Sequence, residues 1–127
     1  MSRRFWWVVG VVLVALALVV CLIPMPPPKH PVEFDDKIAH LLGHCALAVY
    51  FTGLVDRRGW WMIFVFLLLF GIGVEVAQHH MNLGREGDVR DVMGNTLGDL
   101  LGLLIGYLGV SRWPAWFGAL VGRRAAE

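Results

Sequence analysis

The segment Gly71–Gly98, GIGVEVAQHHMNLGREGDVRDVMGNTLG, decides the fold of this chain. It begins and ends inside apolar stretches, yet its middle carries many polar and ionisable side chains: Glu75, Gln78, His79, Arg85, Asp88, Arg90, Asp91 and Asn95. Ionisable groups placed in or against a bilayer are costly, so they need partners and often mark a functional site. The segment therefore predicts two membrane helices joined by a polar loop.

The composition of the whole chain supports this reading. Of 127 residues, 57% are hydrophobic and only 17% are charged. A soluble domain of this size could not cover that much apolar surface, so we predict a single membrane domain over residues 1–127. The net charge of +1, with no basic cluster, gives no indication of a nucleic-acid partner. Cys21 and Cys45 lie in separate apolar segments without metal-ligand spacing, and we interpret them as packing residues.

Four apolar segments are predicted to span the membrane, at residues 5–23, 38–55, 60–80 and 91–110. The first is about 19 residues without a charge, which is enough to cross the hydrocarbon core. A cleaved signal peptide is the rival interpretation, but the apolar run is long and no small-x-small site follows it. Prolines from Pro24 onward end this helix, and the chain to Asp35 is expected to be extended. Residues 56–59 form a predicted turn and residues 81–90 a predicted loop.

The C-terminal tail, residues 112–124, is too short to span. Its apolar residues recur at helical spacing on one face: Trp113, Trp116, Phe117, Leu120 and Val121. Arginines beside that face favour a helix lying on the membrane surface, and a disordered tail is the alternative. The predicted fold class is thus all-α, an integral membrane four-helix bundle with a short C-terminal interfacial helix.

Lysine and arginine positions predict the orientation. With the N-terminus in the cytoplasm, the inner side holds seven basic residues and the outer side four. This bias predicts that both termini are cytoplasmic. The polar ends of the second, third and fourth helices then share the outer level of the membrane.

Each of these three helices has a polar face at i, i+4, i+7, i+8 spacing. The faces are Asp36, His40, Gly43 and His44; Gly71, Glu75, Gln78 and His79; and Asp91, Asn95, Gly98 and Asp99. We expect the faces to meet one another rather than lipid. Asp99 would lie about 12 Å below the start of its helix, so it should be protonated, paired or hydrated.

The fourth helix also carries a glycine ridge, Gly94, Gly98, Gly102 and Gly106. Such small-xxx-small ridges let helices approach closely. The second or third helix is predicted to pack there, and homo-oligomerisation through the ridge is the competing interpretation.

Three motifs resemble the VanZ-like family of membrane proteins. They are Asp36-Lys37-x-x-His40, Glu75-x-x-Gln78, and Arg85 followed by Asp91-x-x-x-Asn95-x-x-Gly98, and the resemblance covers roughly Asp36 to Gly106, most of the chain. The family is named for a protein associated with low-level teicoplanin resistance, and its molecular activity is not settled. The resemblance implies a role in the bacterial cytoplasmic membrane and cell envelope. It does not extend to His44, His79, His80 or Asp99.

The predicted function is binding of a lipid head group or lipid-linked cell-wall intermediate in an outward-facing polar pocket, with a contribution to glycopeptide tolerance. The predicted ligand-binding residues are Asp36, Lys37, Gln78, Arg85, Arg90 and Asn95. Arginines in the loop would grip a phosphate or carboxylate in bidentate fashion.

Two alternatives stay open. The first is a membrane-embedded enzyme that uses Glu75, His40 and Asp91 for acid–base chemistry on a lipid-linked phosphate, since a carboxyl in a low-dielectric site suits such work. The second is a purely structural cluster that locks helix packing. A zinc site of His40, His44, Glu75 and His79 is conceivable but lacks a known signature, so neither a metal nor a cofactor is predicted.

Overall fold

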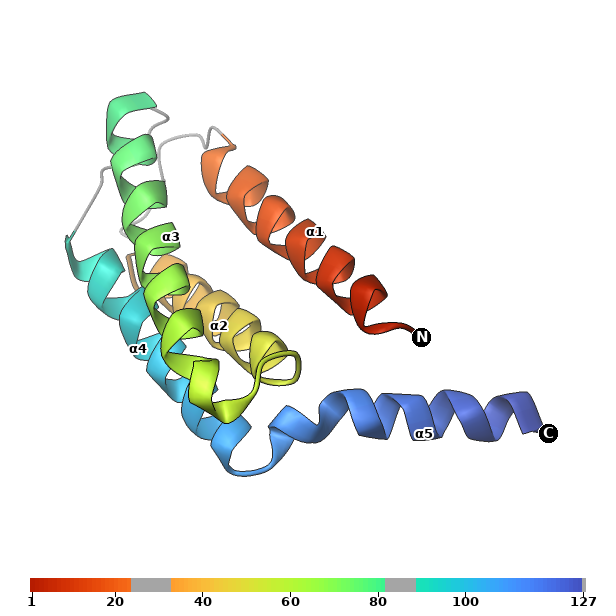
Figure 1. Ribbon diagram of the computed structural model, residues 1–127. Helices are drawn as coiled ribbons and strands as arrows, with labels where there is room; N and C mark the ends of the chain where they lie inside the picture. The colour runs from red at the N-terminus through yellow and green to blue at the C-terminus, as the bar shows by residue number, and fades with distance from the viewer. Residues whose placement is uncertain (24–32, 82–88, 127) are drawn as a thin grey trace.

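The computed structural model describes residues 1–23, 33–81 and 89–126, with the backbone alone at 33–36 and 126. These residues form five α-helices and no strand. The helices are α1 (Arg3–Leu22), α2 (Glu33–Thr52), α3 (Trp60–Met81), α4 (Val89–Tyr107) and α5 (Trp113–Ala126), shown in Figure 1. Short 3-10 turns at Arg57–Gly59 and Val110–Arg112 precede α3 and α5. The prediction of an all-helical chain is confirmed.

The helices differ in how well they suit a bilayer. α1, and α3 with its preceding turn, are long and apolar enough to cross a membrane. α4 qualifies only when taken together with α5, across a bend of 72°. α2 is not a candidate by this measure, because its first turns include Glu33, Asp35, Asp36 and Lys37. The chain is therefore a membrane protein, while four spans and the direction of insertion remain predictions.

The boundaries of α2 and α4 differ from the predicted ones. α2 begins at Glu33, where the sequence suggested extended chain up to Asp35. Acidic residues in a first turn are favoured by the positive end of the helix dipole, which explains the earlier start. α4 begins at Val89 and ends at Tyr107, three residues short of the prediction. The end follows from Gly109, whose φ of 124° is a conformation that suits glycine and turns the chain toward α5.

α2 and α4 form the most extensive helix pair, and the glycine ridge of α4 is the reason. A Cβ atom added at Gly98 would collide with the carbonyl oxygen of Leu41. One added at Gly102 would lie 2.5 Å from the Cβ of Ala48, and one at Gly106 would lie 2.6 Å from Oγ1 of Thr52. Within one chain, α2 thus occupies the ridge from Gly98 to Gly106. Gly94 lies apart, with nothing within 4 Å of its added Cβ.

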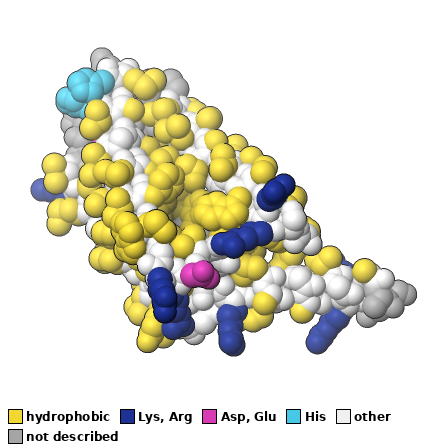
Figure 2. Space-filling model, viewed as in Figure 1, with side chains coloured by type: hydrophobic (Ala, Val, Ile, Leu, Met, Phe, Trp, Pro, Cys, Tyr) yellow, Lys and Arg dark blue, Asp and Glu magenta, His cyan; other side chains and the backbone are white. Residues whose placement is uncertain are grey.

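The apolar core occupies the half of the bundle nearest the chain ends. It is built from the last turns of α2, the α2–α3 turn and the first half of α3: Leu47, Ala48, Phe51, Leu54, Ile63 and Leu67. Val14 and Ala17 of α1 pack against it. Many large apolar side chains point outward instead, among them Val8, Val11 and Leu69, each more than 60% exposed. Figure 2 shows how fully such side chains cover one face, as expected of a surface that meets lipid.

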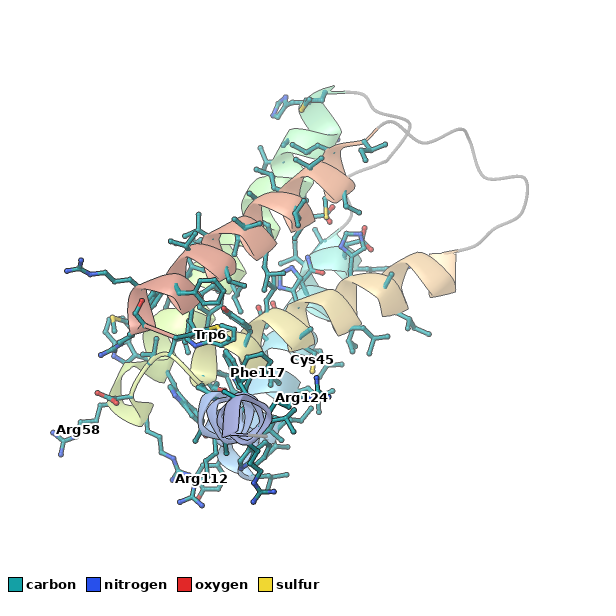
Figure 3. All side chains as sticks on the ribbon, turned by 90° about the vertical axis from the view of Figure 1, so that its right-hand side faces the viewer. Trp6, Cys45, Arg58, Arg112, Phe117 and Arg124 are labelled. Carbon is teal, nitrogen blue, oxygen red and sulfur yellow. The ribbon has the colours of Figure 1, made fainter. Side chains whose placement is uncertain are left out.

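Aromatic contacts fasten α5 to the bundle. The Trp113 ring stacks on Tyr50 with centroids 5.0 Å apart, and Trp6 meets both Trp113 and Phe117 edge-on at 5.1 Å. Trp113 Nε1 donates a hydrogen bond to the Tyr50 carbonyl at 3.1 Å. Figure 3 shows Trp6 and Phe117 close to one another at the end where α1, α2 and α5 meet. Beyond these contacts α5 leaves Trp116, Leu120 and Val121 exposed, which agrees with a helix that lies on a membrane surface.

Candidate functional site

Polar side chains from three helices converge in the half of the bundle away from the chain ends. We call His44, Glu75, Gln78, Asn95 and Asp99 the polar cluster, and none of them is more than 6% exposed. His44 comes from α2, Glu75 and Gln78 from α3, and Asn95 and Asp99 from α4. The predicted meeting of the three polar faces is thus visible in the burial of these side chains.

Gly71 of α3 makes this convergence geometrically feasible. A Cβ at Gly71 would lie 3.1 Å from Nδ2 of Asn95 and 3.2 Å from Cε1 of His44. Both contacts are tighter than van der Waals distance, so a larger residue would require the Asn95 or His44 side chain to shift by a few tenths of an ångström. The glycine therefore brings the backbone of α3 directly against polar side chains of α2 and α4.

The innermost polar contact joins His44 and Asp99. His44 Nδ1 and Asp99 Oδ1 are hydrogen-bonded at 2.8 Å, and Asp99 is fully buried. The Phe70 ring, with its centroid 6.1 Å from that of His44, flanks the pair. A buried ionisable group in an apolar medium is tolerated when such a partner is present. The expectation that Asp99 would be paired, protonated or hydrated is met by a pair, and its partner is a histidine outside the family motifs.

Asn95 has a different environment. It is 2% exposed, and neither its amide oxygen nor its amide nitrogen has a hydrogen-bond partner among the described residues. Oδ2 of Asp99 likewise has none there. A buried amide without hydrogen bonds costs about 1–3 kcal/mol. Next to the His44–Asp99 pair, the structure therefore places one amide donor group and acceptor oxygens that can form hydrogen bonds with a bound molecule.

Gln78 has a bond that joins two helices. Its Nε2 donates to the carbonyl oxygen of Cys21 at 2.7 Å. Cys21 lies in the last turn of α1, where carbonyls lack partners within the helix. Gln78 therefore attaches the end of α1 to α3, a packing role for a residue that we predicted to bind ligand.

The remaining predicted site residues lie toward the same end of the bundle. Glu75 is buried, while Lys37, His40 and Asp91 are half-buried and Arg90 is exposed. Arg85 and the side chain of Asp36 lie outside the described residues. The candidate catalytic set of Glu75, His40 and Asp91 thus combines one buried and two half-buried groups.

Three details of the predicted faces are wrong. His79 is exposed, with its ring against His80 at a centroid distance of 5.6 Å. It lies one residue beyond Gln78, and 100° of helical rotation carries it away from α4. Gly43 is exposed beside buried His44 for the same reason. Gly94 belongs to the glycine ridge in sequence but not in packing.

The outward direction of His79 also removes one ligand from the conceivable zinc site. Within residues 1–23, 33–81 and 89–126, no group of three or more His, Cys, Asp and Glu side chains is arranged to hold a metal ion.

Two cavities of about 540 and 550 Å³ lie at the opposite end and along α1, and no residue of the polar cluster lines either of them. The first opens between the N-terminus, the α2–α3 turn and the start of α5. The second is an apolar groove between α1 and α3.

Comparison with known proteins identifies the family. The VanZ/LLP1 family model matches residues 4–110. This chain belongs to the VanZ/LLP1 family. No curated protein and no solved structure matches it.

The VanZ/LLP1 match runs from the start of α1 to the 3-10 turn after α4, and it includes the whole polar cluster. α5 and Arg3 lie outside the matched residues. The family resemblance seen in the three motifs is therefore confirmed. His44 and Asp99 were not part of those motifs. The indication that they would meet was that each lies eight residues after the first residue of its polar face.

Proposed function

We propose that this VanZ/LLP1 protein acts in the cell envelope by binding a lipid head group or lipid-linked cell-wall intermediate at the polar cluster, and that this binding contributes to glycopeptide tolerance. Asn95 carries the proposal. Its buried amide can offer two donors and an acceptor to a ligand, and the described residues use none of them.

The depth of Asn95 along α4 is compatible with a bound head group. Asn95 lies six residues after the start of α4, about 9 Å along the helix axis. A phosphate or sugar entering beside the ends of α3 and α4 would need to pass only a short distance below the membrane boundary. Arg90 at the start of α4 is exposed, and its positive charge would attract the anionic group of such a ligand.

Asn95→Leu tests the proposal, because leucine keeps the approximate shape and removes the amide. In detergent micelles we expect the variant without ligand to be as stable as wild type or about 1–2 kcal/mol more stable. A short-chain polyprenyl phosphate at a hundred times its dissociation constant should stabilise wild type by about 2.7 kcal/mol. The variant should lose most of that gain.

Thr96→Val is the matched control, since the Thr96 hydroxyl already bonds the Val92 carbonyl in its own helix at 2.8 Å. It should keep the ligand-induced gain. If Asn95→Leu instead lowers stability without ligand, the amide serves packing and the purely structural alternative is correct. In cells, wild type but not Asn95→Leu should raise the teicoplanin concentration needed to stop growth.

The His44–Asp99 contact favours a second candidate, acid–base chemistry on a lipid-linked phosphate. A carboxylate that orients an imidazole is a recurrent arrangement for proton transfer. Glu75, His40 and Asp91 would complete the proton-transfer groups of such an enzyme. Phosphate release from a polyprenyl diphosphate by wild type, and its loss in His44→Gln, would support this function; no release by wild type would exclude it for that substrate.

A further inference from the structure

The two cavities adjoin at the end of the molecule where both described chain ends lie. We call the first the arginine cavity; its lining includes Arg3, Asp56, Arg57 and Ser111. We call the second the α1–α3 groove, and every residue that lines it is apolar. Val55 lines both, and the consecutive residues Trp6 and Trp7 line one each. The polar cavity and the apolar groove thus share a wall at Val55.

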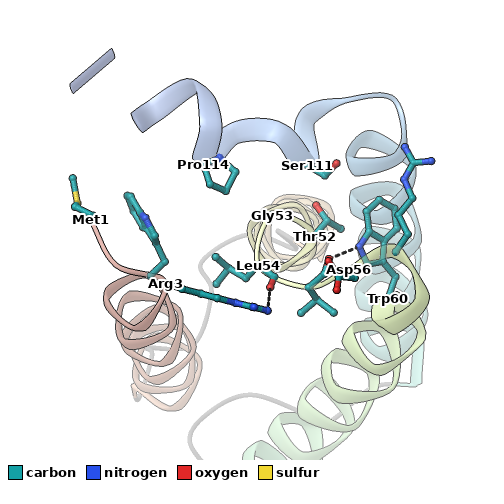
Figure 4. A pocket seen from close by; sticks show the side chains of 12 residues that line it. Met1, Arg3, Thr52, Gly53, Leu54, Asp56, Trp60, Ser111 and Pro114 are labelled. Carbon is teal, nitrogen blue, oxygen red and sulfur yellow. Dashed lines mark hydrogen bonds between the residues drawn. The ribbon is translucent and has the colours of Figure 1, made fainter. Parts of the chain in front are cut away.

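Charge in the arginine cavity favours an anion. Arg3 Nη2 donates to the Leu54 carbonyl at 3.2 Å, and Figure 4 shows the side chain reaching across the cavity to make this bond. A guanidinium has five N–H donors, so this bond leaves Arg3 able to contact a second group. Arg57 also lines the cavity, although its guanidinium packs 4.8 Å from the centre of the Tyr107 ring and its Nη2 donates to the Tyr107 carbonyl at 3.5 Å. Asp56 alone opposes the two arginines in the lining.

The α1–α3 groove has the length of one acyl chain in a leaflet. Along α1 its lining runs from Trp7 to Leu18, about 17 Å at 1.5 Å per residue. Half of a typical hydrocarbon core is about 15 Å. Val11, Met62 and Phe66 are all exposed in this lining, so the groove is open to the lipid side. Figure 2 shows the apolar face ending at a group of basic side chains.

Tryptophan side chains place the junction at the membrane surface. Trp6 and Trp60 line the arginine cavity, and Trp60 Nε1 donates to the Val55 carbonyl at 3.0 Å. Tryptophan prefers the level of the lipid head groups. The cavity is therefore at head-group height and the groove at acyl-chain height.

We propose that this composite site binds one anionic phospholipid, with its phosphate at Arg3 and one acyl chain in the α1–α3 groove. The site is distinct from the polar cluster and does not depend on the proposed function. A second copy of the chain would also bury the groove, but it would not explain why the Arg3 side chain reaches across a polar cavity at the groove's end.

Lipid binding is measured on the full chain purified in detergent, by native mass spectrometry with added lipid. Dioleoyl phosphatidylglycerol should bind more tightly than dioleoyl phosphatidylcholine, because one arginine near the membrane surface strengthens anionic-lipid binding about fivefold. Glycerol 3-phosphate, which has the head-group phosphate without acyl chains, should not bind. Equal affinity for the two lipids, or binding of glycerol 3-phosphate alone, would overturn the proposal.

Two pairs of variants locate the site. Arg3→Gln should weaken phosphatidylglycerol binding about fivefold, while Arg123→Gln, the same charge change on exposed α5, should not. Val11→Phe should fill the groove and weaken the binding of both lipids. Val12→Phe, on the neighbouring face of α1, should leave the binding of both lipids unchanged. Equal effects within either pair would refute the site.

Asn95→Leu separates this proposal from the proposed function. It should keep phosphatidylglycerol binding at the wild-type level, because Asn95 lines neither cavity. Concentration-dependent dimers that Val11→Phe abolishes, without any lipid preference in wild type, would assign the groove to a second copy instead.

Discussion

Replacing single glycines of α4 tests how closely α2 and α4 approach. In Gly102→Ala, the new methyl would lie 2.5 Å from both the Ala48 Cβ and the Cys45 carbonyl oxygen. Neither neighbour is the flexible end of a long side chain, so α2 itself must move. In Gly94→Ala the methyl meets nothing within 4 Å. The two variants thus make the same chemical change on the same helix in opposite surroundings.

The expected change in unfolding free energy follows from two opposing contributions, helix propensity and overpacking. Alanine in a helix interior is favoured over glycine by about 1 kcal/mol. Overpacking at a close contact costs about 1–3 kcal/mol, and the upper end applies to Gly102 because the contact is with rigid atoms. Gly102→Ala should therefore lose about 2 kcal/mol of unfolding free energy, and Gly94→Ala should gain up to about 1 kcal/mol.

Reversible unfolding in mixed micelles, followed by far-ultraviolet circular dichroism, measures both variants. A Gly102→Ala protein as stable as Gly94→Ala would show that α2 does not lie against the ridge, and the helix packing described above would be wrong. Light scattering on the same samples tests the predicted homo-oligomer. The ridge near Gly94 is open, so a dimer formed there should weaken in Gly94→Ala.

Two further predictions concern the polar cluster and the bend. His44→Leu leaves the Asp99 carboxyl buried without its partner, and we expect the free energy of unfolding to fall by about 3–5 kcal/mol. The double variant His44→Leu/Asp99→Leu should lose less unfolding free energy than the two single variants added together. Additive losses would contradict the His44–Asp99 pair. In Gly109→Ala, an alanine must adopt a φ of 124°, and the variant should lose about 1–2 kcal/mol of unfolding free energy. Gly118→Ala, in exposed α5, should not destabilise the protein. Equal melting temperatures for the two variants would refute the strained bend.

Much of the helical architecture was predictable because it follows from local spacing. Glu75, Gln78, Asn95 and Asp99 are buried as their helical positions indicated. The errors concern neighbouring residues of one helix turn, which point in different directions about the helix axis. His79 and Gly43 adjoin buried residues in the chain yet face outward. Each successive residue turns by 100° about the helix axis, and four positions spread over nine residues do not define a face more narrowly than that.

The sequence by itself determined that the chain is an all-helical membrane protein, that it carries the VanZ-like motifs, and that its polar residues collect on three helices. These conclusions depend on composition and periodicity, which are properties of the chain alone. Only the tertiary structure decided which polar residues pair. His44 and Asp99 are 55 positions apart, and they meet because Gly71 and Gly98 let three helices approach closely. The junction of the arginine cavity with the α1–α3 groove likewise exists only in the fold, since its walls come from α1, the α2–α3 turn, α3 and the start of α5.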